Sequence, residues 1–72
     1  MALLKNMDGT ERENVKIGRR VAIVQKQDQL TGKLTEGIVA EILTSAFYHP
    51  RGIKVQLQSG EVGRVQEILG NR

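Results

Sequence analysis

Residues 52–58 restrict the fold most, because apolar residues occupy every second position there. Side chains on a β-strand alternate between its two faces, so this pattern predicts a strand with one buried face. Ser59-Gly60 follows and predicts a two-residue hairpin turn, after which residues 62–65 return as the next strand. The apolar positions of the first strand are Ile53, Val55 and Leu57.

The rest of the chain also reads as short strands joined by polar loops. Residues 21–24 form an apolar, β-branched run, and residues 34–43 form a second one. Polar loops are expected between them over 25–33 and after them over 44–51. No segment longer than about 10 residues keeps a helical period. We therefore expect an all-β fold, a small SH3-like or Sm-like barrel of roughly four to five short strands.

Glycine spacing supports a strongly bent barrel. Gly37 interrupts the second apolar run and predicts a β-bulge or a sharp bend there. Gly18 before the first strand, with Gly32 and Gly37 before and in the second, is similar to the opening of KOW modules in ribosomal and transcription proteins. The later strand–turn–strand resembles the distal hairpin of SH3-like and Sm-like barrels.

The chain divides into two parts on this interpretation. Residues 1–14 carry a turn signal at Asp8-Gly9 and no strand pattern, so we expect a flexible N-terminal tail. Residues 15–70 form the barrel domain. Its expected core consists of Ile17, Val21, Ile23, Val24, Ile38, Val39, Ile42, Leu43, Ile53, Val55, Leu57, Val62, Val65 and Ile68.

Composition limits the classes of function. The 72 residues contain no cysteine, which excludes disulfides, thiolate nucleophiles and cysteine-type zinc sites. Their formal net charge is +3, and residues 18–54 hold six cations against three carboxylates. No apolar run approaches the roughly 18 residues of a membrane span. We expect a cytoplasmic protein that is not an enzyme and binds no cofactor or metal.

Several strings together resemble one family. They begin with Lys26-Gln27-Asp28-Gln29 and Thr31-Gly32-Lys33-Leu34-Thr35, and continue through His49-Pro50, Gly52-Ile53-Lys54-Val55 and Gly63-Arg64-Val65-Gln66. This set is similar to the YwbE-like family of short, uncharacterised bacterial proteins, over roughly residues 15–69. The resemblance implies a domain of unknown function and names no ligand.

The first loop is the leading candidate for a binding site. Lys26, Gln27, Gln29 and Lys33 offer amides and ammonium groups, which can contact phosphates, and glutamine can pair with a base edge. The alternative is a solvated hairpin loop in which polar side chains bind the turn backbone.

The second loop mixes aromatic and basic side chains. Tyr48, beside Phe47, offers a ring on which a base could stack, while His49 and Arg51 could hold phosphate. The alternative is that Phe47 or Tyr48 caps the barrel end while His49 satisfies a backbone group. His49 is the only histidine, so a metal site or a nucleophilic triad has too few members.

Alternation places further polar residues on one sheet face. Lys54 and Gln56 share a face of one hairpin strand, and Arg64 and Gln66 share a face of its partner. Together they predict a basic strip that could extend a nucleic-acid site; the alternative is an ordinary solvated sheet.

These features favour a small non-catalytic protein that binds RNA or single-stranded nucleic acid. Two other interpretations stay open. One is a protein-interaction module, in which the aromatic loop or a strand edge receives a partner chain. The other is a homo-oligomer built by edge-strand pairing, as in Sm-like proteins, and we expect either a monomer or a weak homo-oligomer of this kind.

Overall fold

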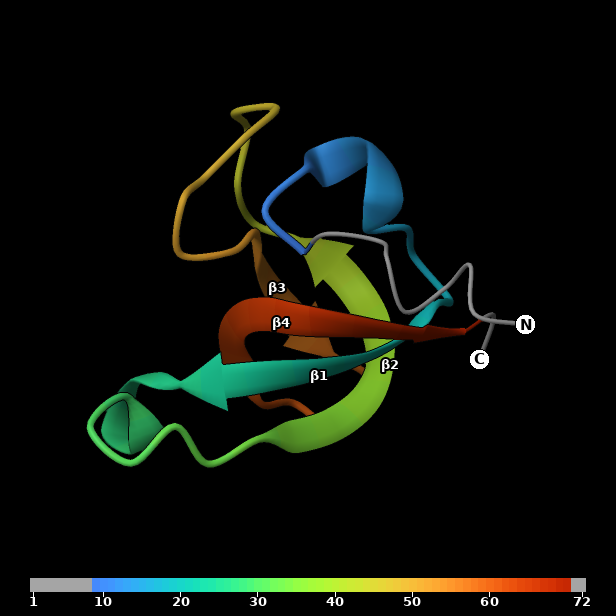
Figure 1. The fold of residues 1–72 in the computed structure, drawn as a ribbon. Helices are drawn as coiled ribbons and strands as arrows, with labels where there is room; N and C mark the ends of the chain where they lie inside the picture. Colours follow the sequence, from blue (N-terminus) through green and yellow to red (C-terminus); the bar gives the residue numbers. More distant parts are fainter. Residues whose placement is uncertain (1–8, 71–72) are drawn as a thin grey trace.

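The computed structural model describes residues 9–70, which form a closed antiparallel barrel of four strands (Figure 1). The strands run in chain order around the barrel, and β4 closes it by pairing with β1. Two single-turn 3-10 helices, η2 and η3, precede and follow β1. The elements are η2 (Arg12–Asn14), β1 (Arg20–Gln25), η3 (Lys26–Asp28), β2 (Thr35–Ile42), β3 (Lys54–Leu57) and β4 (Val62–Gly70). The predicted all-β barrel is confirmed.

β2 is the strand that bends the sheet into a barrel. Its first half pairs with β1, from Thr35 to Ile38, and its second half pairs with β3, from Val39 to Ile42. Figure 1 shows the strong curve of β2 between these two partners. The register shifts between Val39 and Glu41, which is the place of the β-bulge. The bulge predicted at Gly37 is therefore displaced toward the end of the strand.

Gly37 has a different reason for lacking a side chain. Its backbone pairs with Val21 without any register shift. A Cβ atom there would sit 2.6 Å from Leu57 Cδ1, and Leu57 is buried. The curved β2 thus packs its backbone directly on a core side chain, and any larger residue at this position would have to displace Leu57.

Gly37→Ala should destabilise the domain by about 1–3 kcal/mol, because the new methyl overpacks the core at Leu57. Thermal unfolding by circular dichroism measures it, and roughly 4–8 °C is expected per kcal/mol for a domain of this size. The double variant Gly37→Ala/Leu57→Ala supplies the control. Leu57→Ala should cost less in the Gly37→Ala background than alone, and strict additivity would contradict the contact.

The core fills the barrel interior from all four strands. Most expected core residues are buried, but Ile17 and Leu43 are exposed, at 67% and 42%. Val24, Ile38, Ile42 and Val62 are half-buried. Two core residues, Val15 and Ala22, were not expected. The buried apolar side chains are Val15, Val21, Ala22, Ile23, Val39, Ile53, Val55, Leu57, Val65 and Ile68.

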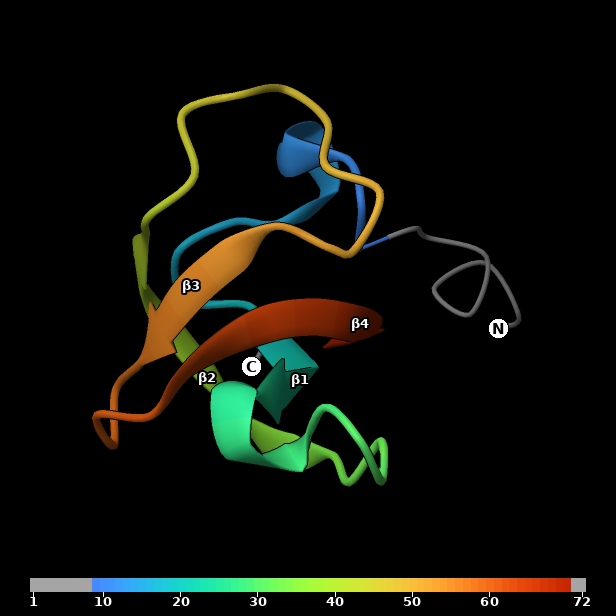
Figure 2. The same cartoon turned by 90° about the vertical axis from the view of Figure 1, so that its left-hand side faces the viewer.

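Residues 9–14 pack on the barrel, although the predicted tail extends to residue 14. Gly9 is buried, and its carbonyl accepts a hydrogen bond from Ile53 N at 2.9 Å. Thr10 O accepts one from His49 N, and Arg12 N donates one to Phe47 O. In Figures 1 and 2 this blue segment lies beside the yellow loop over 44–51. The prediction is wrong for residues 9–14, because the 47–53 segment supplies hydrogen-bond partners for them; residues 1–8 lie outside the described residues.

The β3–β4 turn has three residues rather than the predicted two. Gln56 pairs with Val62, and Leu57 N donates to Glu61 O at 2.8 Å, which leaves Gln58–Gly60 as the loop. Gly60 has a φ of 107°, a conformation that glycine adopts without strain. A three-residue loop of this kind needs one left-handed residue, which explains the glycine at this position.

Candidate functional site

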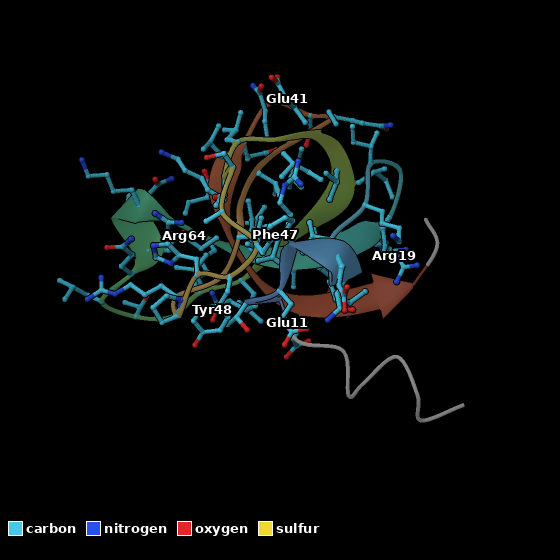
Figure 3. The ribbon with its side chains drawn as sticks, turned by 90° about the horizontal axis from the view of Figure 1, so that it is seen from above. Glu11, Arg19, Glu41, Phe47, Tyr48 and Arg64 are labelled. Carbon is cyan, nitrogen blue, oxygen red and sulfur yellow. The ribbon has the colours of Figure 1, made fainter. Side chains whose placement is uncertain are left out.

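Two adjoining hollows open along β4, where the polar loops meet the sheet. The larger has a volume of about 590 Å³ and lies between the η3 segment and the β3–β4 hairpin. The smaller has a volume of about 300 Å³ and reaches the second loop at Arg51. Figure 3 shows Arg64 between the green η3 segment and the yellow-orange loop over 44–52. Segments distant in sequence are thus brought to one surface.

Close packing of β4 on β1 shapes the floor of the larger hollow. Gly63 and Val24 line it together, and a Cβ atom on Gly63 would sit 2.4 Å from Val24 O. The glycine lets the two backbones approach, so the floor carries few side chains at this point. Val24 itself is half-buried and lines both hollows.

A tight turn at residues 49–52 positions Arg51. Gly52 N donates to His49 O at 2.9 Å, with Pro50 at the second turn position, where its fixed φ is favoured. Arg51 N also donates to His49 Nδ1 at 3.1 Å. In this geometry Nδ1 is an acceptor, so the histidine holds the turn through its side chain as well as its backbone.

Two side chains of β4 donate hydrogen bonds to backbone carbonyl groups of the same turn. Arg64 Nη1 donates to Gly52 O at 3.1 Å. Gln66 Nε2 donates to Arg51 O at 3.0 Å. Each contact links β4 to the turn across the smaller hollow, whose lining includes Arg51, Arg64 and Gln66. These two hydrogen bonds therefore hold the turn that carries Arg51 against the strand that carries Arg64.

Positive charge dominates the lining of the two hollows. Lys26, Arg51, Lys54 and Arg64 line them, against a single carboxylate, Glu61. Within residues 9–70, none of these four cations forms an ion pair; the pair that is present joins Arg20 and Glu36 at 3.2 Å, outside both hollows. The cations of the hollows are free to bind an external anion.

Glu61 stays ionised at the rim of the larger hollow. The Ser59 hydroxyl donates a hydrogen bond to its carboxylate, which lowers the pKa of Glu61 below its ordinary value. The residue is half-buried, and its carboxylate lies among the residues that line the larger hollow. Glu61 therefore places one negative charge at the hairpin end of a surface that is otherwise basic.

The structure brings together most residues predicted to form a site. Seven line one or both hollows, and these are Lys26, Gln27, Gln29, Arg51, Lys54, Arg64 and Gln66. Lys33, Tyr48 and His49 line neither hollow. His49 acts instead as an acceptor inside the turn, and Lys33 N donates to Thr31 Oγ1 in the first loop.

Phe47 and Tyr48 do not form one stacking platform. Tyr48 forms a β-bridge with Glu11, and Phe47 O accepts the hydrogen bond of Arg12 N. Phe47, 81% exposed, lines a separate hollow with Ile17 and Ile42. The chain bends at Phe47 and enters the bridge at Tyr48, and of the two rings only that of Phe47 lines this hollow.

The sequence did not identify the floor of the site. Val24 appeared as core, and Gly60, Gly63 and Glu61 as hairpin residues, yet all line a hollow. The repeated glycine in Gly60-Glu61-Val62-Gly63 was the available signal, because glycine in a strand marks a close backbone approach.

The described part of the chain contains neither a cluster of metal ligands nor a helix that could span a membrane. Residues 9–70 contain no group of three histidine, aspartate or glutamate side chains that could hold a metal ion. Over the same residues, no helix has the length and hydropathy needed to cross a membrane.

Fold and site together define a small closed β-barrel that carries a cationic, hollowed surface along its last strand. The chain belongs to a family described as "Uncharacterized conserved protein (DUF2196)", whose model matches residues 8–68. It is similar to the uncharacterised protein YwbE of Bacillus subtilis (strain 168), with 52% identity over 63 residues, which cover 88% of this chain and 97% of YwbE. The YwbE-like resemblance is thereby confirmed. No solved structure matches the chain.

Proposed function

We propose that this protein is a non-catalytic binding protein for RNA or other single-stranded nucleic acid, with the two hollows as its site. The observation that carries the proposal is the convergence of Lys26, Arg51, Lys54 and Arg64 on one surface without carboxylate partners among the described residues. Cations held this way can neutralise backbone phosphates and release counterions, which drives nucleic-acid binding.

The remaining lining suits bases rather than a bare phosphate. Gln27 and Gln29 offer amides that can pair with base edges, and Val24 with Gly63 offers an apolar floor. Unpaired bases are exposed in single strands, so they can reach such a surface, whereas in a duplex they are stacked inside. The KOW-like glycine pattern adds support at the level of fold analogy.

A protein-interaction module is the second candidate function. The exposed side chains of Phe47 and Ile17 line a hollow with Val15, Ile42 and three charged residues, and this hollow shares no lining residue with the basic ones. An apolar surface of this kind is typical of partner binding. Self-association through free strand edges is less favoured, because the closed barrel pairs each strand with two neighbours.

The salt dependence of binding tests the nucleic-acid proposal. Four phosphate contacts on a single strand give a slope of about −3 in log affinity against log salt, so affinity should fall roughly 50-fold between 50 and 200 mM. Fluorescence anisotropy of a labelled mixed-sequence RNA single strand measures this slope. Lys26→Ala/Lys54→Ala should reduce its magnitude by about 1.4, because two contacts are lost.

Lys16→Ala is the matched control. Lys16 is exposed and lines the hollow of Phe47 instead of the basic ones. Lys16→Ala also removes a lysine charge, but outside the basic hollows. The salt slope of this variant should therefore equal that of the wild type within experimental error. Absence of binding at 50 mM salt, or equal effects of Lys16 and of the Lys26/Lys54 pair, would reject this surface as a nucleic-acid site and favour the protein-interaction module.

A further inference from the structure

We propose that the two hollows hold two successive nucleotides of one strand, and that Arg64 binds the phosphate between them. This inference rests on the proposed function and specifies its geometry. Three residues line both hollows: Val24, Gln29 and Arg64. Among them only Arg64 is charged, so the boundary between the hollows is where a bridging anion would sit.

Arg64 is prepared for this position by its own contacts. One Nη1 hydrogen bond to Gly52 O, at 3.1 Å, orients the guanidinium, and the residue is half-buried. A guanidinium has five N–H donors, so four remain for a ligand. An oriented arginine loses little conformational freedom when it binds, and its planar fork matches two phosphate oxygens.

The volumes on either side agree with one nucleotide in each hollow. Hollows of about 300 and 590 Å³ lie at the size of small-molecule sites, which range from roughly 300 to 1,000 Å³. The larger one adds Lys26 and Lys54 on its walls, and the smaller adds Arg51. Phosphates that flank the central one would therefore also meet a cation.

Gln29 supplies a group able to contact bases on both sides. It is exposed, it lines both hollows, and its side chain forms no hydrogen bond with residues 9–70. Gln25 and Gln27 differ, because their amides hydrogen-bond each other at 3.3 Å and Gln25 also binds Thr35. Of these amides, Gln29 keeps both its donor and its acceptor for a ligand.

A titration of the full-length ¹⁵N-labelled chain tests the inference by NMR. The probes are adenosine 5′-monophosphate and the ribodinucleotide ApA, which contains one internal phosphodiester and no terminal phosphate. We expect ApA to bind at least tenfold more tightly, although the monophosphate carries more charge. ApA should shift the Arg64 Nε–H and the Gln29 side-chain amide, together with backbone amides of both linings.

Variants separate the role of Arg64 from general charge. Arg64→Gln should remove the tenfold advantage of ApA, and Arg64→Lys should retain part of it while keeping the charge. Arg20→Gln is the matched control, because Arg20 pairs with Glu36 outside both hollows. The wild-type shifts are a readout that does not depend on how the variants fold.

The outcomes for this inference and for the proposed function differ. Equal affinity for both probes, or ApA binding without a shift at Arg64, would overturn the two-nucleotide arrangement. If a longer RNA strand still bound with the dependence on Lys26 and Lys54, the proposed function would stand without it. If no strand bound, both would fail.

Discussion

Gly52→Ala should largely unfold the domain, with a loss of about 4 kcal/mol or more in the free energy of unfolding. Gly52 has a φ of 104°, and a Cβ atom there would sit 2.2 Å from Val65 O. The strained φ alone costs about 1–3 kcal/mol. The clash adds to it because the obstacle is the backbone of β4, which is paired on both sides and cannot rotate away as a side chain could. Thermal unfolding followed by circular dichroism measures the loss.

Gly18→Ala separates the two contributions. Gly18 has a similar φ of 89°, but nothing lies within 4 Å of its added Cβ. It should therefore lose only the strain of the left-handed conformation, about 1 kcal/mol. Equal melting temperatures for the two variants would show that the approach of Gly52 to Val65 is not a constraint on stability.

Removal of residues 1–14 should lower the melting temperature far more than removal of residues 1–8. The difference between the two truncations isolates residues 9–14, which make three backbone hydrogen bonds to the 47–53 segment. At about 1 kcal/mol each they contribute roughly 3 kcal/mol. For a domain of this size that corresponds to about 12–24 °C.

Both truncated chains are compared by thermal unfolding and by RNA binding. Loss of residues 9–14 releases the support of the turn that carries Arg51, because His49 N and Ile53 N lose their acceptors. RNA affinity should therefore fall along with stability. Melting temperatures within about 4 °C of each other, the change expected for roughly 1 kcal/mol, would show that residues 9–14 add little to the packed domain.

Much of the candidate site followed from local chemistry. Cations and amides in the first loop, and the alternation of Arg64 with Gln66, were visible because polar side chains on one strand face must share a surface. Arg51 and the first loop, by contrast, are at least 18 residues apart in the sequence. Only closure of the barrel, with β4 paired to β1, brings them to adjoining hollows.

The aromatic residues show what local chemistry does not decide. Phe47 and Tyr48 are adjacent to His49 and Arg51, so composition alone suggests one binding loop. The β-bridge between Glu11 and Tyr48 sets the backbone direction there, and it depends on a segment that carries no strand pattern. Pairing with a distant segment, which the local sequence cannot encode, separates the rings from the cations.

By itself the sequence determined the class of the fold and the approximate strands, because alternation and glycine spacing reflect how a strand divides its faces and bends. The family followed from the resemblance of several residue strings. Tertiary structure decided three further points. It placed the register shift of β2 between Val39 and Glu41, in the half of the strand that pairs with β3 rather than β1. It buried Val15 and exposed Ile17, since residues 9–14 pack on the 44–51 loop. It also gathered the unpaired cations along β4, since strand closure joins surfaces that are far apart along the chain.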